Sequence, residues 1–369
     1  MMENKEYLTD QIVTYIGNKR SLLDFIGKAV KSVMQDLGKE KISIFDVFSG
    51  SGIVSRYLKQ YASVLYANDL EGYAKTLNTC YLSNKSEIDL VELDKWYNFV
   101  NLILEGRPLV DDGFIRELYS PKDDNDIQDG ERVFYTVRNA RYLDTARQTL
   151  ELVPEPYKTL LLAPLLCEAS IKTNTSGVFK GFYKNSNTKR GQFGGNGRNA
   201  LSRILADIEV KKPILSNFEC EVHVLQGDSN EVCKEIPEVD LAYLDPPYNQ
   251  HPYGSNYFML NLLNEYKRPE EVSKVSGIPT DWHKSSYNKK QTALNSLKDL
   301  CTNLKAKYVL ISYNSEGFIT FDEMVEALET LGVVKVFDQQ YNTFRASRNL
   351  RDRDIHVTEY LFLLEKEDR

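Results

Sequence analysis

The sequence predicts an α/β fold with a mostly parallel sheet and flanking helices. Short apolar stretches rich in β-branched residues recur in the first and last thirds of the chain, separated by segments with helical periodicity. Such alternation is typical of a parallel sheet. It lapses between residues 85 and 218, where charge instead segregates by position. We therefore expect residues 1–84 and 219–369 to form one α/β domain, interrupted by an inserted, partly helical domain at residues 85–218.

The composition is that of a globular chain. The 369 residues are 42% hydrophobic and 27% charged, and 16 Phe and 23 Tyr are too many for a disordered protein. The longest apolar stretch, residues 160–167, is too short to span a membrane and contains a proline. The first residues lack the apolar region of a secretion signal, and the five cysteines form no CxxC pair. We therefore expect a location in a reducing cytoplasm.

The first third contains the opening of a nucleotide site. A helical pattern over residues 17–37 precedes a strand at 42–47 and a glycine-rich turn at 49–52. A helix from residue 53 leads to a second strand that ends on Asp69. The order strand, glycine turn, helix, strand, acid is typical of a Rossmann-like site, although two glycines after a strand can also form only a tight turn.

The last third resumes the alternation. Strands are predicted at residues 221–225, 239–244 and 308–313, followed by two more at about 333–337 and 357–364. We expect the final strand to be antiparallel. The loop between the last two strands carries both arginines and aspartates, so a solvated loop and a DNA contact are equally good interpretations; its arginines are Arg345, Arg348, Arg351 and Arg353.

Charge is distributed unevenly along the chain. Lys+Arg of 46 against Asp+Glu of 53 gives a net charge of −7, which repels nucleic acid overall. Residues 111–131 carry eight acids and two bases, whereas residues 172–203 carry seven bases, six glycines and no acid. This basic stretch favours DNA contact over a flexible solvated loop. The expected DNA-binding residues are Lys172, Asn174, Lys180, Lys184, Lys189, Arg190 and Arg198.

The strongest chemical signal is Asp245-Pro246-Pro247-Tyr248 at the end of an apolar strand. The prolines remove two backbone donors and stiffen the chain, which leaves the Asp245 carboxylate and the Pro246 carbonyl as acceptors. Two acceptors beside an aromatic face suit an exocyclic amino group on a flat ring, on which Tyr248 stacks. In isolation, a turn with a half-buried tyrosine is an equally good interpretation. At a strand end downstream of a glycine-rich turn, we favour the functional one.

With these motifs in this order, the chain resembles the Dam-like, alpha-group amino-methyltransferases that methylate N6 of adenine in DNA. The resemblance covers about two-thirds of the chain. It implies that Asp245, Pro246 and Tyr248 are catalytic, and that residues 85–218 form the target-recognition domain. It also implies S-adenosylmethionine as cofactor, double-stranded DNA as partner, and a cognate restriction endonuclease acting on the same site in a prokaryotic or phage-type host. The implied cofactor-binding residues are Tyr15, Lys19, Asp46, Phe48, Gly50, Gly52, Asp69, Asp228 and Asp245.

Individual roles follow from the same resemblance. Tyr15 and Lys19 hold the methionine end of the cofactor, Asp69 grips the ribose hydroxyls, and Asp228 accepts from the adenine amino group, although it can also cap the following helix. The target adenine is expected to flip out of the duplex. Tyr253, Tyr257 and Phe258 either wall the same pocket or belong to an ordinary core.

Other functions are compatible with parts of this pattern. The same chemistry could act on cytosine N4, an RNA adenine or a protein amide, and a catalytically inactive DNA- or adenosine-binding module would retain the motifs. A nicotinamide dehydrogenase is the weakest alternative, since the dinucleotide fingerprint is incomplete. The four histidines lack ligand spacing, so no metal site is expected.

Overall fold

A computed structural model describes residues 2–342 and 356–367. Its centre is a seven-stranded sheet in the order β3-β2-β1-β4-β5-β7-β6. The neighbours from β3 to β5 are parallel, and β7 is antiparallel to both β5 and β6. This confirms the predicted Rossmann-like α/β class and the antiparallel last strand. The strands are β1 (Ile42–Asp46), β2 (Ala62–Asp69), β3 (Glu221–Gln226), β4 (Val239–Leu244), β5 (Ala306–Asn314), β6 (Gly332–Asn342) and β7 (His356–Lys366).

Helices cover both faces of the sheet. Successive strand residues point to opposite faces, and both faces carry apolar side chains that the helices bury. Ile44 of β1 belongs to the core under α2 and α3, whereas its neighbour Phe45 belongs to the core on the other face. The first face is covered by η1 (Lys19–Leu22), α2 (Leu23–Leu37) and α3 (Ile53–Leu58). The second is covered by α10 (Ser229–Glu235), η3 (Ser286–Asn288), α13 (Lys290–Asn303) and α14 (Phe321–Glu329).

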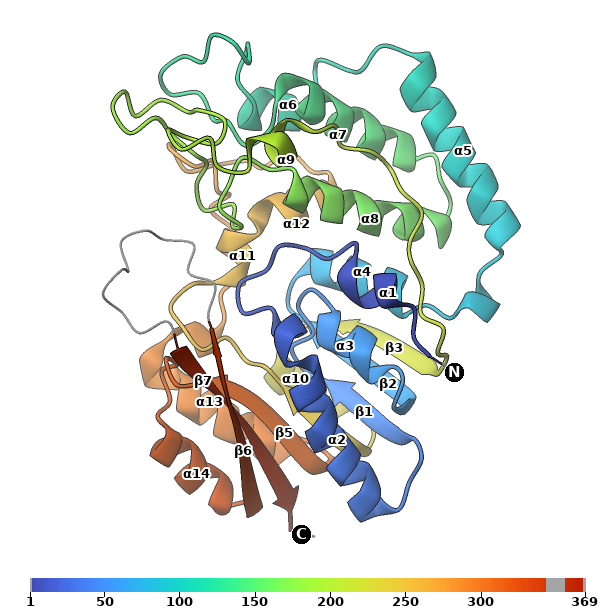
Figure 1. Ribbon diagram of the computed structural model, residues 1–369, viewed down its shortest axis with the longest axis vertical. Helices are drawn as coiled ribbons and strands as arrows, with labels where there is room; N and C mark the ends of the chain where they lie inside the picture. Colours follow the sequence, from blue (N-terminus) through green and yellow to red (C-terminus); the bar gives the residue numbers. More distant parts are fainter. Residues whose placement is uncertain (1, 343–355, 368–369) are drawn as a thin grey trace.

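A helical layer lies beyond one end of the sheet (Figure 1). It shares one hydrophobic core, to which α4 and α12 also contribute. The Phe258 ring at the start of α12 lies within 6.3 Å of the rings of Phe134 and Phe179. Thus α12, which follows the predicted boundary at residue 218, packs in the same core as the helices before that boundary. The helices not yet given are α1 (Lys5–Thr9), α4 (Gly72–Leu82), η2 (Lys85–Glu87), α5 (Leu90–Gly106), α6 (Phe114–Tyr119), α7 (Val137–Leu150), α8 (Tyr157–Ile171), α9 (Leu201–Leu205), α11 (Tyr253–Asn256) and α12 (Phe258–Glu265).

The sheet order reverses between β1 and β4, since β1 continues to β2 on one side and β4 to β5 on the other. At such a switch point the carboxyl ends of the strands border a crevice. The glycine turn follows β1 and the Asp-Pro-Pro-Tyr loop follows β4, so both border this crevice. The helical layer stands over this edge, and the N-terminal segment before α2 passes between the two layers (Figure 1).

Arg56 of α3 fixes the N-terminal segment. Its buried guanidinium donates to the carbonyl oxygens of Tyr7 at 3.0 Å and Gln11 at 2.9 Å, and it lies 3.5 Å from the centre of the Tyr81 ring. The arginine donates to the Tyr7 carbonyl, shares the Gln11 carbonyl with the Cys167 thiol, and so ties the segment to the sheet domain. Within the described part of the chain, no helix has the length and apolar character needed to cross a membrane.

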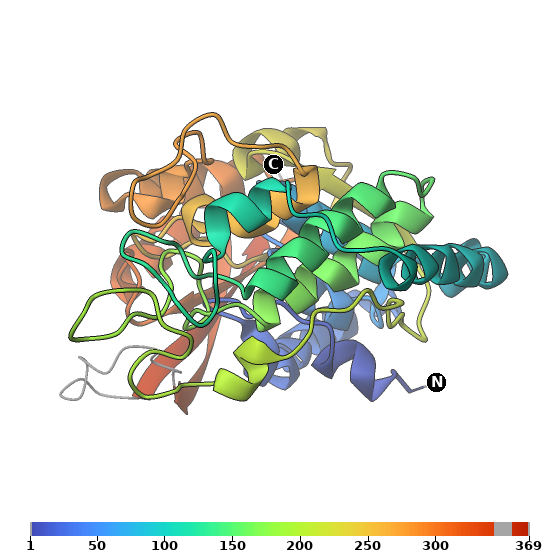
Figure 2. The ribbon, with the colours of Figure 1, turned by 90° about the horizontal axis from the view of Figure 1, so that it is seen from above.

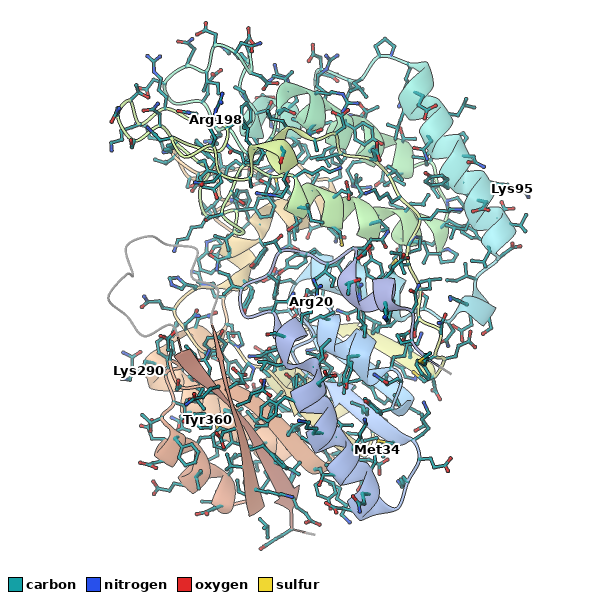
Figure 3. The ribbon with its side chains drawn as sticks, viewed as in Figure 1. Arg20, Met34, Lys95, Arg198, Lys290 and Tyr360 are labelled. Carbon is teal, nitrogen blue, oxygen red and sulfur yellow. The ribbon has the colours of Figure 1, made fainter. Side chains whose placement is uncertain are left out.

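Replacing Arg56 with alanine should lower the free energy of unfolding by about 3 kcal/mol, because buried carbonyls lose their donors and a large side chain leaves a cavity. Denaturant unfolding measures the loss. Arg20→Ala is the control, since Arg20 is exposed on the neighbouring 3-10 turn (Figure 3) and should change stability by less than about 0.5 kcal/mol. Equal stability of the two variants would contradict the anchoring role.

Candidate active site

A pocket opens at the carboxyl ends of β1, β2 and β4. Its empty space, open mouth included, is about 900 Å³. The structure brings together most of the residues implied to bind a cofactor, from five separate parts of the sequence. Those lining the pocket are Tyr15, Lys19, Phe48, Gly50, Asp69, Asp228 and Asp245.

Two of the predicted cofactor residues, Asp46 and Gly52, do not line the pocket. Asp46 is fully buried at the end of β1, accepts a 2.5 Å hydrogen bond from Ser55 Oγ, and burial raises its pKa to about 7. Gly52 has a φ of 80°, and a Cβ there would lie 2.7 Å from Asn78 Oδ1. Both therefore shape the glycine turn from behind, and their direct contact with a cofactor stays a prediction.

The acids facing the pocket are held by backbone groups. Asp69 accepts from the Gly50 amide at 2.8 Å and from the Glu71 amide at 2.9 Å. Burial raises the pKa of Asp69 to about 6, against the lowering effect of these donors. Asp228 caps α10 by accepting from the Asn230 amide at 2.9 Å, and it lines the pocket as well. The capping role and a pocket-facing position thus coexist in one side chain.

Tyrosines form one wall. The Tyr15 ring stacks on Tyr253 at 5.0 Å and on Tyr257 at 4.5 Å between centroids. Tyr257 Oη accepts from the Ile16 amide at 2.7 Å, so it fixes the segment that carries Tyr15. Of the three aromatic residues left open by the sequence, Tyr253 lines the pocket, Tyr257 lies behind it, and Phe258 belongs to the core of the helical layer.

Asp245 lies beside a buried lysine. Lys19 Nζ is 3.3 Å from Asp245 Oδ1 and 2.7 Å from Glu359 Oε1. Burial raises the pKa of Asp245 to about 7, although Lys19 lowers it. For Lys19, burial alone lowers the pKa, but the two facing carboxylates outweigh it and hold the pKa well above the usual value. The ammonium therefore stays charged while Asp245 exchanges a proton near neutral pH.

The rest of the Asp-Pro-Pro-Tyr loop frames this carboxylate. Pro247 lines the pocket, whereas Pro246 is buried and does not. Tyr248 lies edge-on to Tyr313 at 6.0 Å, and Lys19 Nζ is 5.5 Å from the centre of the Tyr248 ring. A Cβ at Gly17 would lie 3.0 Å from Tyr248 Oη, at a φ of 73°. A glycine at this position therefore allows the N-terminal motif to approach the loop closely.

Sequence reasoning missed several pocket residues. Glu71, His283, Tyr287 and Asn288 all line it. Tyr287 lies edge-on to Phe48 at 5.1 Å, and His283 Nδ1 is 3.3 Å from Glu71 Oε2. His283 lies in a loop, and Tyr287 and Asn288 lie in the single turn η3 that follows it. Only the tertiary fold returns this segment to the pocket, so no periodicity points to these residues. Glu71 follows the predicted acid Asp69 by two residues, which was a usable signal.

The basic stretch forms irregular loops and a short hairpin at the end of the helical layer opposite α5 (Figures 1 and 2). Lys184 and Gly191 form an antiparallel bridge, and the Asn185 amide donates to the Arg190 carbonyl at 2.8 Å. We call residues 184–191 the basic hairpin. Its exposed side chains include Lys184, Lys189 and Arg190. Two further predicted residues, Lys180 and Arg198, are exposed nearby, and Figure 3 labels Arg198.

Two predicted DNA-binding residues have internal roles instead. Asn174 is fully buried, where its side chain donates to the Val133 carbonyl at 2.7 Å and accepts from the Gly194 amide at 2.9 Å. Lys172 pairs with Glu168. We therefore exclude both from the candidate DNA surface, because their polar groups are already used within the protein. The arginine loop from Arg345 to Arg353 lies outside the described residues.

In the described part of the chain, no three His, Cys, Asp or Glu residues cluster as a metal site.

Together, the sheet order, the glycine turn after β1 and the Asp-Pro-Pro-Tyr loop after β4 define a Rossmann-like methyltransferase fold. Comparison with known families narrows this class. Residues 15–327 match the model of the D12 class N6 adenine-specific DNA methyltransferases, so the chain belongs to that family of enzymes.

Individual relatives agree with this family. The chain is 28% identical over 361 residues to the type II methyltransferase M.CviAII of Paramecium bursaria Chlorella virus 1, covering 95% of this chain and 98% of the relative. It is also 28% identical to the type II methyltransferase M.NlaIII of Neisseria lactamica, with 96% and 99% covered. The modification methylase StsI of Streptococcus sanguinis is 26% identical, and the chain spans 52% of its length.

The raised pKa of Asp245 predicts a cost to stability. A carboxyl whose pKa is higher when folded than when unfolded stabilises the fold while protonated, and this is lost as pH rises from about 4 to about 7. Asp245→Asn should therefore match the wild type near pH 4. At pH 8 it should be more stable by about 1–3 kcal/mol, a range reduced because 19% of the side chain is exposed. Denaturant unfolding at both pH values measures the difference; an equal difference at the two would contradict it.

Proposed function

We propose that the protein transfers a methyl group from S-adenosylmethionine to N6 of a flipped adenine in double-stranded DNA, as the modification enzyme of a restriction–modification system. The observation that carries the proposal is the position of Asp245. It stands at the end of β4, in the same pocket as Asp69 and the glycine turn, in a chain of the N6-adenine family. The restriction–modification context is supported by the two type II relatives, and it implies a cognate endonuclease.

The pocket residues fit the cofactor. A Cβ at Gly50 would lie 3.0 Å from the Tyr15 ring, so glycine at this position allows Tyr15 to pack against the turn beside the pocket. Asp69 offers carboxylate oxygens to ribose hydroxyls, and Asp228 can accept from the adenine amino group. Phe48 and Tyr287 supply an aromatic wall for the base. The acids facing the pocket suit a ligand that carries a sulfonium cation.

The side chains of the loop act on the target amino group. When bound, the cofactor supplies a reactive methyl group, so the protein contributes orientation and electrostatics. The N6 lone pair of adenine is delocalised into the ring and is a poor nucleophile. Asp245 and the Pro246 carbonyl accept the two amino hydrogens, which favours a more tetrahedral nitrogen aimed at the methyl group. Tyr248 stacks on the base, and the proton leaves as the methyl arrives.

The base must leave the duplex to reach Asp245, at a cost of a few kcal/mol. Stacking on Tyr248 returns about 1–3 kcal/mol. The basic hairpin and the exposed Lys180 and Arg198 supply the phosphate contacts that hold the DNA. Because the net charge of the chain is −7, this local concentration of positive charge supports DNA binding on that side of the molecule.

The proposal is tested with purified protein, labelled S-adenosylmethionine and mixed-sequence duplex DNA. Label should appear on adenine N6, and Asp245→Ala should reduce transfer by about a thousandfold or more while retaining cofactor binding. Base-resolved mapping of the product then gives the recognition sequence. Label on cytosine N4, label on RNA in place of DNA, or cofactor binding with no transfer at all would each replace the proposal by one of the alternative functions.

Charge reversal in the basic hairpin should weaken DNA binding. Lys189→Glu with Arg190→Glu should reduce the slope of log affinity against log salt by about two, since two phosphate contacts are lost. The matched control is Lys28→Glu with Lys31→Glu, which changes the net charge equally on exposed positions of α2. If both pairs change the slope equally, the effect belongs to net charge and the hairpin is not at the interface.

A further inference from the structure

Glu359 of β7 ends a buried row of polar side chains that reaches the active site. Its side chain is fully buried, and Oε1 accepts from Lys19 Nζ at 2.7 Å and from Ser312 Oγ at 2.5 Å. Lys19 Nζ lies 3.3 Å from Asp245 on its other side. Glu359 does not line the pocket, and it lies beyond residues 15–327, which the family model matches.

The alternation of side chains along β7 directs Glu359 toward Lys19. Tyr360 follows Glu359 on β7 and points to the opposite face of the sheet, where its ring lies 5.1 Å from that of Phe321 (Figure 3). Glu359 is thus directed toward Lys19 by the alternation of the strand. Burying a carboxylate costs free energy when its oxygens are not all hydrogen-bonded. Within the described residues, Glu359 Oε2 has no hydrogen-bond partner.

The row contains one cation between two carboxylates. Glu359 is the closer partner of Lys19 and is also held by Ser312, whereas Asp245 is farther away and 19% exposed. With both acids ionised the group carries one surplus negative charge, and Asp245 is the acid that can relieve it by taking a proton. Burial raises the pKa of Asp245 to about 7, Lys19 opposes this, and Glu359 raises the pKa further.

Other titratable groups also face Asp245, but they do not change the sign of this effect. Of the described residues, the basic group that acts on Asp245 is Lys19. The remaining neighbours are an acid on β1 and phenols that are neutral near pH 7 because burial raises their pKa values. They are Asp46, Tyr243, Tyr248 and Tyr253.

We propose that Glu359 is a positioning residue for methyl transfer, which acts through Lys19 to keep Asp245 a strong enough acceptor for the proton released by the amino group. This inference rests on the proposed function. As the bond from N6 to the methyl carbon forms, the bond from carbon to sulfur breaks and its electron pair stays on sulfur. One amino proton then leaves nitrogen for the Asp245 carboxylate, which passes it to water.

The test compares Glu359→Gln with the wild type in single-turnover methyl transfer to DNA between about pH 5 and 9. Without the Glu359 charge, Lys19 is left to Asp245 alone. The midpoint of the acid limb should fall by about one pH unit or more, and the plateau rate by about tenfold or more. Glu365→Gln is the matched control, because it makes the same change on an exposed position of the same strand and should leave profile and rate unchanged.

A second variant, Glu359→Asp, keeps the inference testable if Glu359→Gln does not fold. Glu359→Asp retains the charge but withdraws it from Lys19, so its midpoint should lie between those of Glu359→Gln and the wild type. A wild-type midpoint in both variants, or a lower rate with no shift of midpoint, would overturn the inference, since a merely structural role predicts either result.

Direct titration of Asp245 separates this inference from the proposed function. Carbon-13 NMR of labelled aspartate carboxyls should show a lower Asp245 midpoint in Glu359→Gln, with the signal assigned by its absence in Asp245→Asn. This measurement does not depend on turnover. If the wild type transfers no methyl group, the proposed function fails; if the carboxyl midpoint does not move, the role of Glu359 fails.

Discussion

The burial of one ammonium group, that of Lys19, determines how the active site is assembled. Burying an ammonium group is costly unless acceptors compensate it, and for Lys19 these acceptors are carboxylates. Here Glu359 reaches it from β7 and Asp245 from the end of β4. The N-terminal segment must therefore close over the sheet before either acid is compensated. Arg56 ties the same segment to α3 through backbone carbonyls. The pocket exists because these contacts hold the N-terminal segment against the switch point.

The same arrangement sets the electrostatics of the pocket. Asp69 is stabilised by backbone amides, whereas Asp245 depends on a lysine that it shares with another acid. The two carboxylates thus differ in what holds them, backbone amides for Asp69 and a shared ammonium for Asp245, while burial raises the pKa of both. Division of roles by environment, with the same functional group, is a general property of active sites.

Local sequence patterns predicted much of this structure. The strands, the glycine turn and the Asp-Pro-Pro-Tyr loop are defined by periodicity and by residue types with fixed backbone preferences. Some roles could not be predicted from local sequence patterns. Asn174 looked like a base-edge donor, but its amide satisfies buried backbone groups, which only the packed loop reveals. Tyr287 and Glu359 reach the site through long-range packing and strand pairing, and no local pattern encodes either.

The ion pair between Lys19 and Glu359 joins residues 340 positions apart. During synthesis from the N-terminus, the lysine emerges long before the nearer of its two acids. A chain still on the ribosome can form the glycine turn and much of the sheet, but β7 is missing and the lysine lacks its nearer counter-charge. Both carboxylates can therefore reach the ammonium only after the whole stretch of chain between Lys19 and Glu359 has been made.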